Sequence, residues 1–252
     1  LNIPGGIELA SMADIPSKGS GLGSSSSFTV GLLNALYAYK NQYISKADLA
    51  REACYIELDK CGEPIGKQDQ YAAAYGGINI IKFHADETVD VEPIICNPGL
   101  VKKIEQHTLV FFTGRTRSAS ALLAQQSKDL ASLDRKKLMR RMVELVFELK
   151  SEMQNNILDN FGSILHENWV LKSQLTNGIS DPQIDDWYKT GIKYGATGGK
   201  LLGAGNGGFL MFFAPPENHI RIQKALNRLK KVDFGFDNSG SQIVFYQPNK
   251  LR

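Results

Sequence analysis

The chain has 252 residues, of which 42% are hydrophobic and 22% charged, enough for one large or two modest domains, each with its own core. Lys and Arg number 29 against 26 Asp and Glu, a net charge of +3, which argues against broad electrostatic capture of nucleic acid or of an acidic membrane. The longest apolar run, residues 209–214, is too short to cross a bilayer. The three cysteines, Cys54, Cys61 and Cys96, form no CxxC pair; this argues against a disulfide or zinc scaffold and favours a reducing, cytoplasmic location.

The first hundred residues are expected to contain short strands and helices. Residues 7–12 predict a strand, and residues 24–39 predict a helix because their apolar side chains recur at helical spacing behind a run of capping serines. Further helices are predicted over residues 45–60 and 68–75, and paired strands over residues 78–83 and 89–95.

The pattern changes near Asn97-Pro98-Gly99, where we place a domain boundary. Strands are predicted over residues 107–113, 209–213 and 242–246, and long helices over residues 135–159, 162–176, 182–194 and 216–230. Strands and helices in this order indicate an α+β fold in two lobes. We expect domains over residues 1–98 and 99–252.

A first cluster of glycines lies between the strand and helix predicted at the start of the chain. Residues 16–27 read PSKGSGLGSSSS, and glycines let successive backbone amides converge on a phosphate while a helix N-terminus adds positive charge. The loop is not a Walker A motif, because serine stands where lysine is required, and its glycines do not follow GxGxxG. A flexible loop followed by an N-cap is the alternative interpretation.

The stretch PxxxGLGSSS after a strand resembles the signature loop of the GHMP kinases. The resemblance implies a two-lobed GHMP kinase fold, with an N-terminal domain like ribosomal S5 domain 2 and a ferredoxin-like C-terminal domain with long helices. It also implies ATP and Mg²⁺ as cofactors, with Ser25 as the first candidate for the metal contact and Ser24 as the second. The phosphate-binding residues would be Ser20, Gly21, Leu22, Gly23, Ser24, Ser25 and Ser26.

Two acidic residues, Glu57 and Asp69, stand twelve positions apart. Phosphoryl transfer requires a cation on the phosphates and a group that orients or deprotonates the attacking hydroxyl. The spacing resembles galactokinase-type members of the family, which implies Mg²⁺ binding by Glu57 and action on the hydroxyl by Asp69. Lys67 would lower the pKa of Asp69 and hold a substrate anion. Without the family, Glu57 would be a solvated helix residue and Asp69 an N-cap.

A second glycine cluster, GATGGKLLGAGNGG over residues 195–208, resembles the family's third motif. That motif closes over the active site beside the phosphates, which implies contacts from Gly203, Gly205, Asn206 and Gly207. Asn206 departs from the family, where glycine is usual. Since asparagine tolerates the left-handed backbone, we expect the turn to persist.

Three further segments, GKQDQYAAAYGG, TGRTRSAS and HENWVLK, resemble the branch of the family that phosphorylates D-glycero-D-manno-heptose 7-phosphate. A sugar that already carries a phosphate needs cations away from the reacting hydroxyl. Candidate substrate contacts are Lys67, Gln70, Gly114, Arg115, Arg117 and Lys172. Trp169 is expected in the core.

The resemblance therefore predicts a sugar 1-kinase with a small sugar phosphate as partner and neither nucleic acid nor membrane, and it is compatible with a homo-oligomer. Kinases of fucose, galactose or arabinose are the alternatives within the family, and a non-catalytic nucleotide-binding domain is the alternative outside catalysis. The family also has an Arg/Lys-x-Pro strand ahead of the loop. Since the sequence opens at Leu1 without it, we expect the first domain to lack its first strands.

Overall fold

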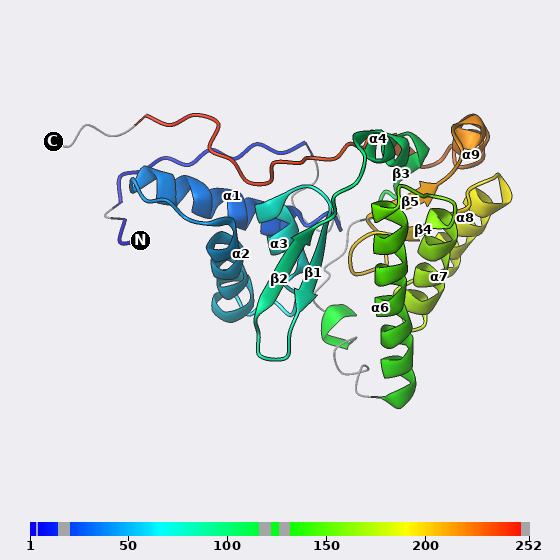
Figure 1. Ribbon diagram of the computed structural model, residues 1–252, viewed down its shortest axis with the longest axis horizontal. Helices are drawn as coiled ribbons and strands as arrows, with labels where there is room; N and C mark the ends of the chain where they lie inside the picture. Colours follow the sequence, from blue (N-terminus) through cyan, green and yellow to red (C-terminus); the bar gives the residue numbers. More distant parts are fainter. Residues whose placement is uncertain (4, 15–20, 116–121, 126–131, 248–252) are drawn as a thin grey trace. The chain divides into compact units, whose positions relative to one another are not determined.

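The computed structural model describes residues 1–3, 5–14, 21–115, 122–125 and 132–247. The chain divides into two compact units. The first comprises Leu1–Lys18, Gly23–Val91 and Asp237–Arg252, and the second comprises Gly19–Leu22 and Glu92–Phe236. Both units contain helices and strands (Figure 1), which confirms the predicted α+β class.

The helices of the first unit pack on one another around a core of small and aliphatic side chains. These helices are α1 (Ser24–Tyr39), α2 (Lys46–Cys54), the π-helix η1 (Tyr55–Lys60) and α3 (Gln68–Tyr75). Ala50, Ala53 and Ala74 are fully buried, and their small size lets the helix backbones approach closely. The strands β1 (Asn79–Phe83) and β2 (Val89–Pro93) pair beside α3.

The segment that begins at Asp237 returns to the first unit and runs beside α1 (Figure 1). The carbonyl of Asp237 accepts a hydrogen bond from the Gly77 amide at 2.6 Å. Lys46 donates to the carbonyls of Tyr75 and Ser239, each at 2.8 Å. Backbone carbonyls of the segment, at Asp237 and Ser239, therefore bind the residue after α3 and the first residue of α2.

The second unit is built on an antiparallel sheet in the order β4-β5-β3-β6. Its elements are α4 (Pro98–His107), β3 (Thr108–Phe112), α6 (Leu133–Gln154), α7 (Phe161–Ser173), α8 (Pro182–Lys193), β4 (Gly198–Leu201), β5 (Phe209–Phe213), the 3₁₀ turn η2 (Pro216–Asn218), α9 (His219–Ala225) and β6 (Lys230–Val232). The helices α6, α7 and α8 lie between β3 and β4 in the sequence, β5 follows β4 directly, and α9 lies between β5 and β6. This order of elements, with the strand order of the sheet, is the ferredoxin-like arrangement that was predicted.

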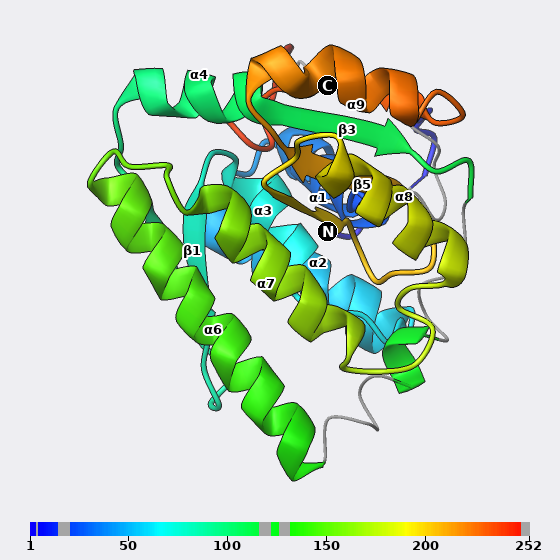
Figure 2. The ribbon, with the colours of Figure 1, turned by 90° about the vertical axis from the view of Figure 1, so that its right-hand side faces the viewer.

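The core of the second unit lies between one face of this sheet and the helices α7, α8 and α9 (Figure 2). Alternate residues of the strands, such as Phe111 and Phe212, point into it, as the two-residue period of a strand requires. Trp169 of α7 is 3% exposed and belongs to the same cluster, which confirms its predicted place in the core.

Two strand predictions are wrong. Residues 7–12 and 242–246 join no sheet among the described residues, and both expose large apolar side chains, among them Met12 and Val244. A strand is stable only when its backbone groups pair with a neighbour. Tyr246 instead donates from its hydroxyl to Asn41, and Ser241 accepts from Asn34 at 3.0 Å, so side chains hold the second segment.

Several helix predictions differ from the structure in their bounds. The helix predicted over residues 45–60 becomes a π-helix after Cys54, and the helix predicted over 135–159 ends at Gln154 because Asn156 takes a left-handed backbone. The helix predicted over 216–230 ends at Ala225, and Lys230–Val232 pairs with β3 instead. The three cysteines are free, and no helix in the described ranges is long and apolar enough to cross a membrane.

Candidate active site

The N-terminus of α1 is shaped by Gly23, which occupies the N-cap position. Gly23 has φ 66° and ψ 25°, a left-handed conformation that a residue with a Cβ adopts only with strain, and no side chain caps the helix. The first turn thus begins at Ser24, and the positive end of the helix dipole lies at the serines that were predicted to bind phosphate. Ser20, the first residue of that prediction, lies outside the described residues.

Glu57 is held by the same turn of α1. Its carboxylate accepts hydrogen bonds from the Ser25 hydroxyl at 2.6 Å on Oε1 and from the Ser26 hydroxyl at 2.7 Å on Oε2. Glu57 is 3% exposed, and a buried carboxylate is stable only when its lone pairs are satisfied. The structure therefore brings together three of the predicted nucleotide and metal residues.

A π-helix places Glu57 in this position. It spans Tyr55–Lys60, and its wider turn rotates side chains relative to the α-helix before it. In this segment Glu57 is buried while Asp59 is exposed. The sequence alone indicated an ordinary helix here, in which a mid-helix glutamate is most often solvated.

Gln70 reaches Glu57 from the first turn of α3. Its Nε2 donates to Glu57 Oε2 at 2.6 Å, and the side chain is 0% exposed. The structure thus places this predicted substrate residue against the predicted metal ligand. Nothing in the sequence indicated this contact, because Gln70 differs from an exposed glutamine only through the packing of α3 on its neighbours.

Asp69 lies directly against the start of α1. A Cβ built on Gly23 would lie 3.1 Å from the Cβ, Cγ and Oδ2 of Asp69, a tighter contact than most Cβ atoms make, so the glycine lets that carboxyl group lie close to the helix start. The two acidic residues predicted from their spacing therefore both meet the first turn of α1: Asp69 at its cap and Glu57 at its serines.

Lys67 pairs with Glu87 in the turn between β1 and β2. The hydrogen bond to Glu87 raises the pKa of Lys67 above its ordinary value. Lys67 therefore carries its charge at neutral pH, as an anion-binding residue must. Its predicted effect on the pKa of Asp69 stays a prediction.

The donor set around Glu57 fits Mg²⁺. This ion prefers oxygen ligands, and in nucleotide sites it is bound through one or two carboxylates and the substrate phosphates. Glu57 supplies a carboxylate and Ser25 a hydroxyl. In the described part of the chain no group of three or more His, Cys, Asp or Glu side chains could hold a metal.

Within the second unit, the second glycine loop contacts Gly21 of the first glycine loop. Gly21 and Gly203 both have φ 76°, and a Cβ on Gly203 would lie 2.6 Å from Gly21 Cα. The two backbones touch there, which only glycines allow. Asn206 has φ 61°, so the left-handed turn persists without glycine, as predicted.

Arg115, one of the cations predicted to bind substrate, has two side-chain partners in this unit. Arg115 pairs with Asp181, the N-cap of α8, and lies 5.6 Å from the Trp187 ring centre. Burial opposes the ionisation of Asp181, but the Ile184 amide and Arg115 outweigh it and hold the pKa of Asp181 below its ordinary value.

Lys172 donates to the carbonyl of Gly203 at 2.5 Å and so fixes the second glycine loop. Within that loop, Gly205 packs on the backbone of Ile179. The remaining residues predicted to bind substrate are Gly207, which packs on the backbone of Arg115, Gly114, which has open space around it, and Arg117, which lies outside the described residues.

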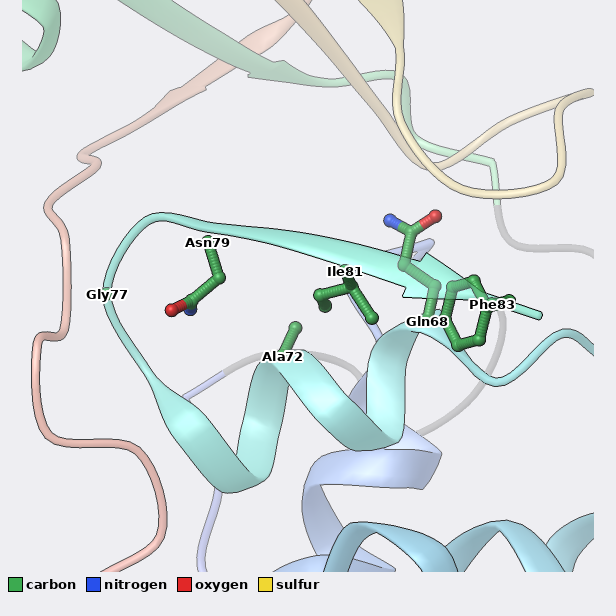
Figure 3. Close-up of a pocket in the computed structure, with 6 residues that line it drawn as sticks. All are labelled: Gln68, Ala72, Gly77, Asn79, Ile81 and Phe83. Carbon is green, nitrogen blue, oxygen red and sulfur yellow. The ribbon is translucent and has the colours of Figure 1, made fainter. Parts of the chain in front are cut away.

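A cavity of about 270 Å³ opens between α3 and β1 in the first unit (Figure 3). Its lining contains Gln68, Ala72, Gly77, Asn79, Ile81 and Phe83. None of these was predicted to be functional. The cavity follows from the two-residue period of β1, which turns Asn79, Ile81 and Phe83 to the same side.

Comparison with known families agrees with this geometry. Residues 1–77 match the GHMP kinases N terminal domain, and residues 149–232 match GHMP kinases C terminal. A D-glycero-alpha-D-manno-heptose 7-phosphate kinase from Campylobacter jejuni is 30% identical over 239 residues, which cover 94% of this chain and 70% of that protein. A galactokinase from Pyrococcus furiosus is 29% identical, covering 89% of this chain and 69% of that protein.

A solved structure described as a D-glycero-D-manno-heptose 1-phosphate kinase from Bacteriodes thetaiotaomicron superposes with a TM-score of 0.65 at 28% identity. The match covers 90% of this chain and 64% of that one. The chain thus spans slightly less than two thirds of the length of this structural relative.

Proposed function

The chain belongs to the GHMP kinase family, and on that premise we propose that it is an ATP-dependent sugar 1-kinase acting on D-glycero-D-manno-heptose 7-phosphate. The product would be the 1,7-bisphosphate, a precursor of nucleotide-activated heptose. One observation carries the proposal: two carboxyl groups, Glu57 and Asp69, meet the first turn of a helix whose serines and dipole suit a nucleotide phosphate.

In the proposed reaction, the C1 hydroxyl oxygen of the sugar attacks the γ-phosphorus of ATP. The bond between that phosphorus and the β–γ bridging oxygen breaks, and ADP leaves. Asp69 accepts the proton of the hydroxyl. The backbone amides of Ser24, Ser25 and Ser26, at the N-terminus of the helix, bind the phosphates.

Glu57 and Ser25 would hold Mg²⁺, which when bound neutralises charge on the phosphates. Three hydrogen bonds hold the Glu57 carboxylate in one orientation, so a metal would meet preorganised ligands. In this proposal, residues 1–98 form the nucleotide-binding domain and residues 99–252 the C-terminal domain. For the second glycine loop, with Gly203, Gly205, Asn206 and Gly207, contact with the phosphates is proposed from the family resemblance alone.

For the sugar phosphate, we propose Lys67 as the principal cation. It stands two residues before Asp69, and its side chain is 28% exposed beside the acidic partner Glu87. A substrate phosphate carries more charge than a carboxylate and can compete for the same ammonium group. Lys67→Ala is expected to raise KM for the phosphorylated sugar more than it lowers kcat, since a cation that binds the phosphate group stabilises the bound substrate and the transition state alike.

The test is an ATP-turnover assay with heptose 7-phosphate, free heptose, fucose, galactose and arabinose as acceptors. Turnover that is fastest with heptose 7-phosphate supports the proposal, and a free sugar as the best acceptor replaces it with another sugar kinase of the family. Binding of ATP without turnover of any acceptor indicates a non-catalytic domain. Asp69→Asn is expected to lower kcat by about 10²–10⁴-fold, the usual contribution of a general base. A cytoplasmic location and a homo-oligomer stay predictions from the sequence.

A further inference from the structure

Gln70 combines complete burial with an incomplete set of hydrogen bonds. The side chain is 0% exposed, and its Nε2 donates to Glu57 at 2.6 Å. Its Oε1 is buried and has no hydrogen-bond partner among the described residues. A buried amide with an unsatisfied acceptor destabilises a fold relative to an apolar side chain of the same size. Packing alone therefore does not explain a glutamine here.

The donor of Gln70 completes a set of three around one carboxylate. Ser26 and Gln70 share Oε2 of Glu57, while Ser25 binds Oε1. The donors come from α1 and α3, and the acceptor comes from the π-helix between them in sequence. All three donors are neutral, so they orient the carboxylate without cancelling its charge.

Gln70 also follows Asp69 directly in the first turn of α3. Neighbouring residues of a helix have side chains about 100° apart around its axis, so the turn that directs Gln70 to Glu57 leaves Asp69 beside Gly23. A substitution that removes the hydrogen bond between Gln70 and Glu57 therefore removes a contact that holds the first turn of α3, the turn that carries Asp69.

We propose that Gln70 is a positioning residue, and not a substrate contact: it fixes the Glu57 carboxylate for Mg²⁺ and ties to it the turn that carries Asp69. The inference rests on the proposed function, because it assumes a metal-bound nucleotide at Glu57. Residues that orient a metal ligand typically contribute about 10- to 100-fold to metal affinity. Loss of the Gln70 amide should weaken the response to Mg²⁺ by a similar factor.

The experiment measures Mg²⁺-dependent binding of a non-hydrolysable ATP analogue by calorimetry, in MgCl₂ and in EDTA. The quantity compared is the Kd in EDTA divided by the Kd in MgCl₂, so a larger ratio means a stronger dependence on Mg²⁺. It is measured for the wild type, for Gln70→Met and for the control Gln68→Met. Methionine has a similar length and no amide. Gln68 lies on the same helix and lines the cavity above α3 (Figure 3).

We expect Gln70→Met to reduce the Kd ratio by about tenfold or more, with a Tm within a few degrees of the wild type because the unsatisfied acceptor is lost together with the donor. Gln68→Met should keep the wild-type ratio. A merely structural role would lower the Tm of Gln70→Met and leave its ratio unchanged. If Gln70→Met does not fold, Gln70→Asn, whose shorter amide cannot span the same distance, decides by the same ratio.

The failures of the two proposals are distinguishable. If the wild type shows no Mg²⁺-dependent binding of the nucleotide analogue, the proposed function is wrong and the role of Gln70 falls with it. If the wild type binds in a Mg²⁺-dependent way and the Gln70 variant keeps the wild-type ratio, only the role of Gln70 is overturned.

Discussion

Replacement of Gly23 by alanine tests the geometry that brings Asp69 to the helix start. The new Cβ would lie 3.1 Å from three atoms of Asp69, whereas carbon atoms rest at about 3.5–4.0 Å. The Asp69 side chain must therefore move by about half an ångström. Alanine must also adopt φ 66°, which costs about 1–2 kcal/mol.

We expect Gly23→Ala to fold with a Tm lowered by about 2–4 °C for each kcal/mol lost. Its kcat should fall much further, by up to about 100-fold, because small displacements of catalytic groups are amplified in the rate. The measurements are thermal unfolding and the ATP-turnover assay.

Gly31→Ala is the matched control, since Gly31 lies within the same helix and a Cβ there meets no atom within 4 Å. Alanine should stabilise the helix at that position by about 0.5–1 kcal/mol and leave kcat unchanged. The reasoning is refuted if folded Gly23→Ala keeps the wild-type kcat, or if Gly31→Ala loses activity to the same extent.

Three further predictions concern stability. Ser45→Ala removes the cap that accepts from the Asp48 amide at 3.1 Å, and urea unfolding should show a loss of about 1 kcal/mol. Gly162→Ala places a Cβ onto Thr197, where α7 meets β4; overpacking of this kind should cost about 1–3 kcal/mol, and an unchanged urea midpoint would contradict the close approach. Because the pKa of Asp181 is lowered in the folded state, its charge stabilises the fold above the unfolded pKa of about 3.9, and this stabilisation is lost as pH falls through the folded pKa. The Tm advantage of the wild type over Asp181→Asn should therefore shrink between pH 6 and pH 3, and a constant advantage would contradict the shift.

The elements that sequence predicted well are those whose signal is local. The helix α3 has the predicted bounds, Gln68–Tyr75, because Gly76 ends it with φ 65°. The helix α8 begins at Pro182, as predicted, because Asp181 caps it and proline suits its first turn. Asn97 followed by Pro98 is the same kind of cap, and it begins α4. From the sequence alone, we interpreted these two residues as part of a domain boundary. The Asn97 side chain accepts from the Gly99 amide at 2.8 Å, so a cap and a linker share one sequence pattern.

The features that sequence could not predict depend on partners distant in the chain. The alternation of residues 7–12 is typical of a strand, yet pairing decides whether a strand forms. The motif spacing predicted Glu57 as a site residue, but its burial depends on the π-helix and on donors from α1 and α3. Arg115 was predicted from the segment TGRTRSAS and from its charge, and its ion pair with Asp181 requires a contact across 66 positions of sequence.

The return of the chain to the first unit at Asp237 has a consequence for biosynthesis. Domains generally fold as units in the order in which the ribosome releases them. Here the first unit includes the segment from Asp237 onward, whose backbone binds Gly77 and Lys46. That segment emerges only after residues 92–236 have been translated, so the second unit can finish folding while α1, α2 and α3 still await the segment that ties their ends. The helices around Glu57 would thus stay without these contacts until after the second unit has been synthesised.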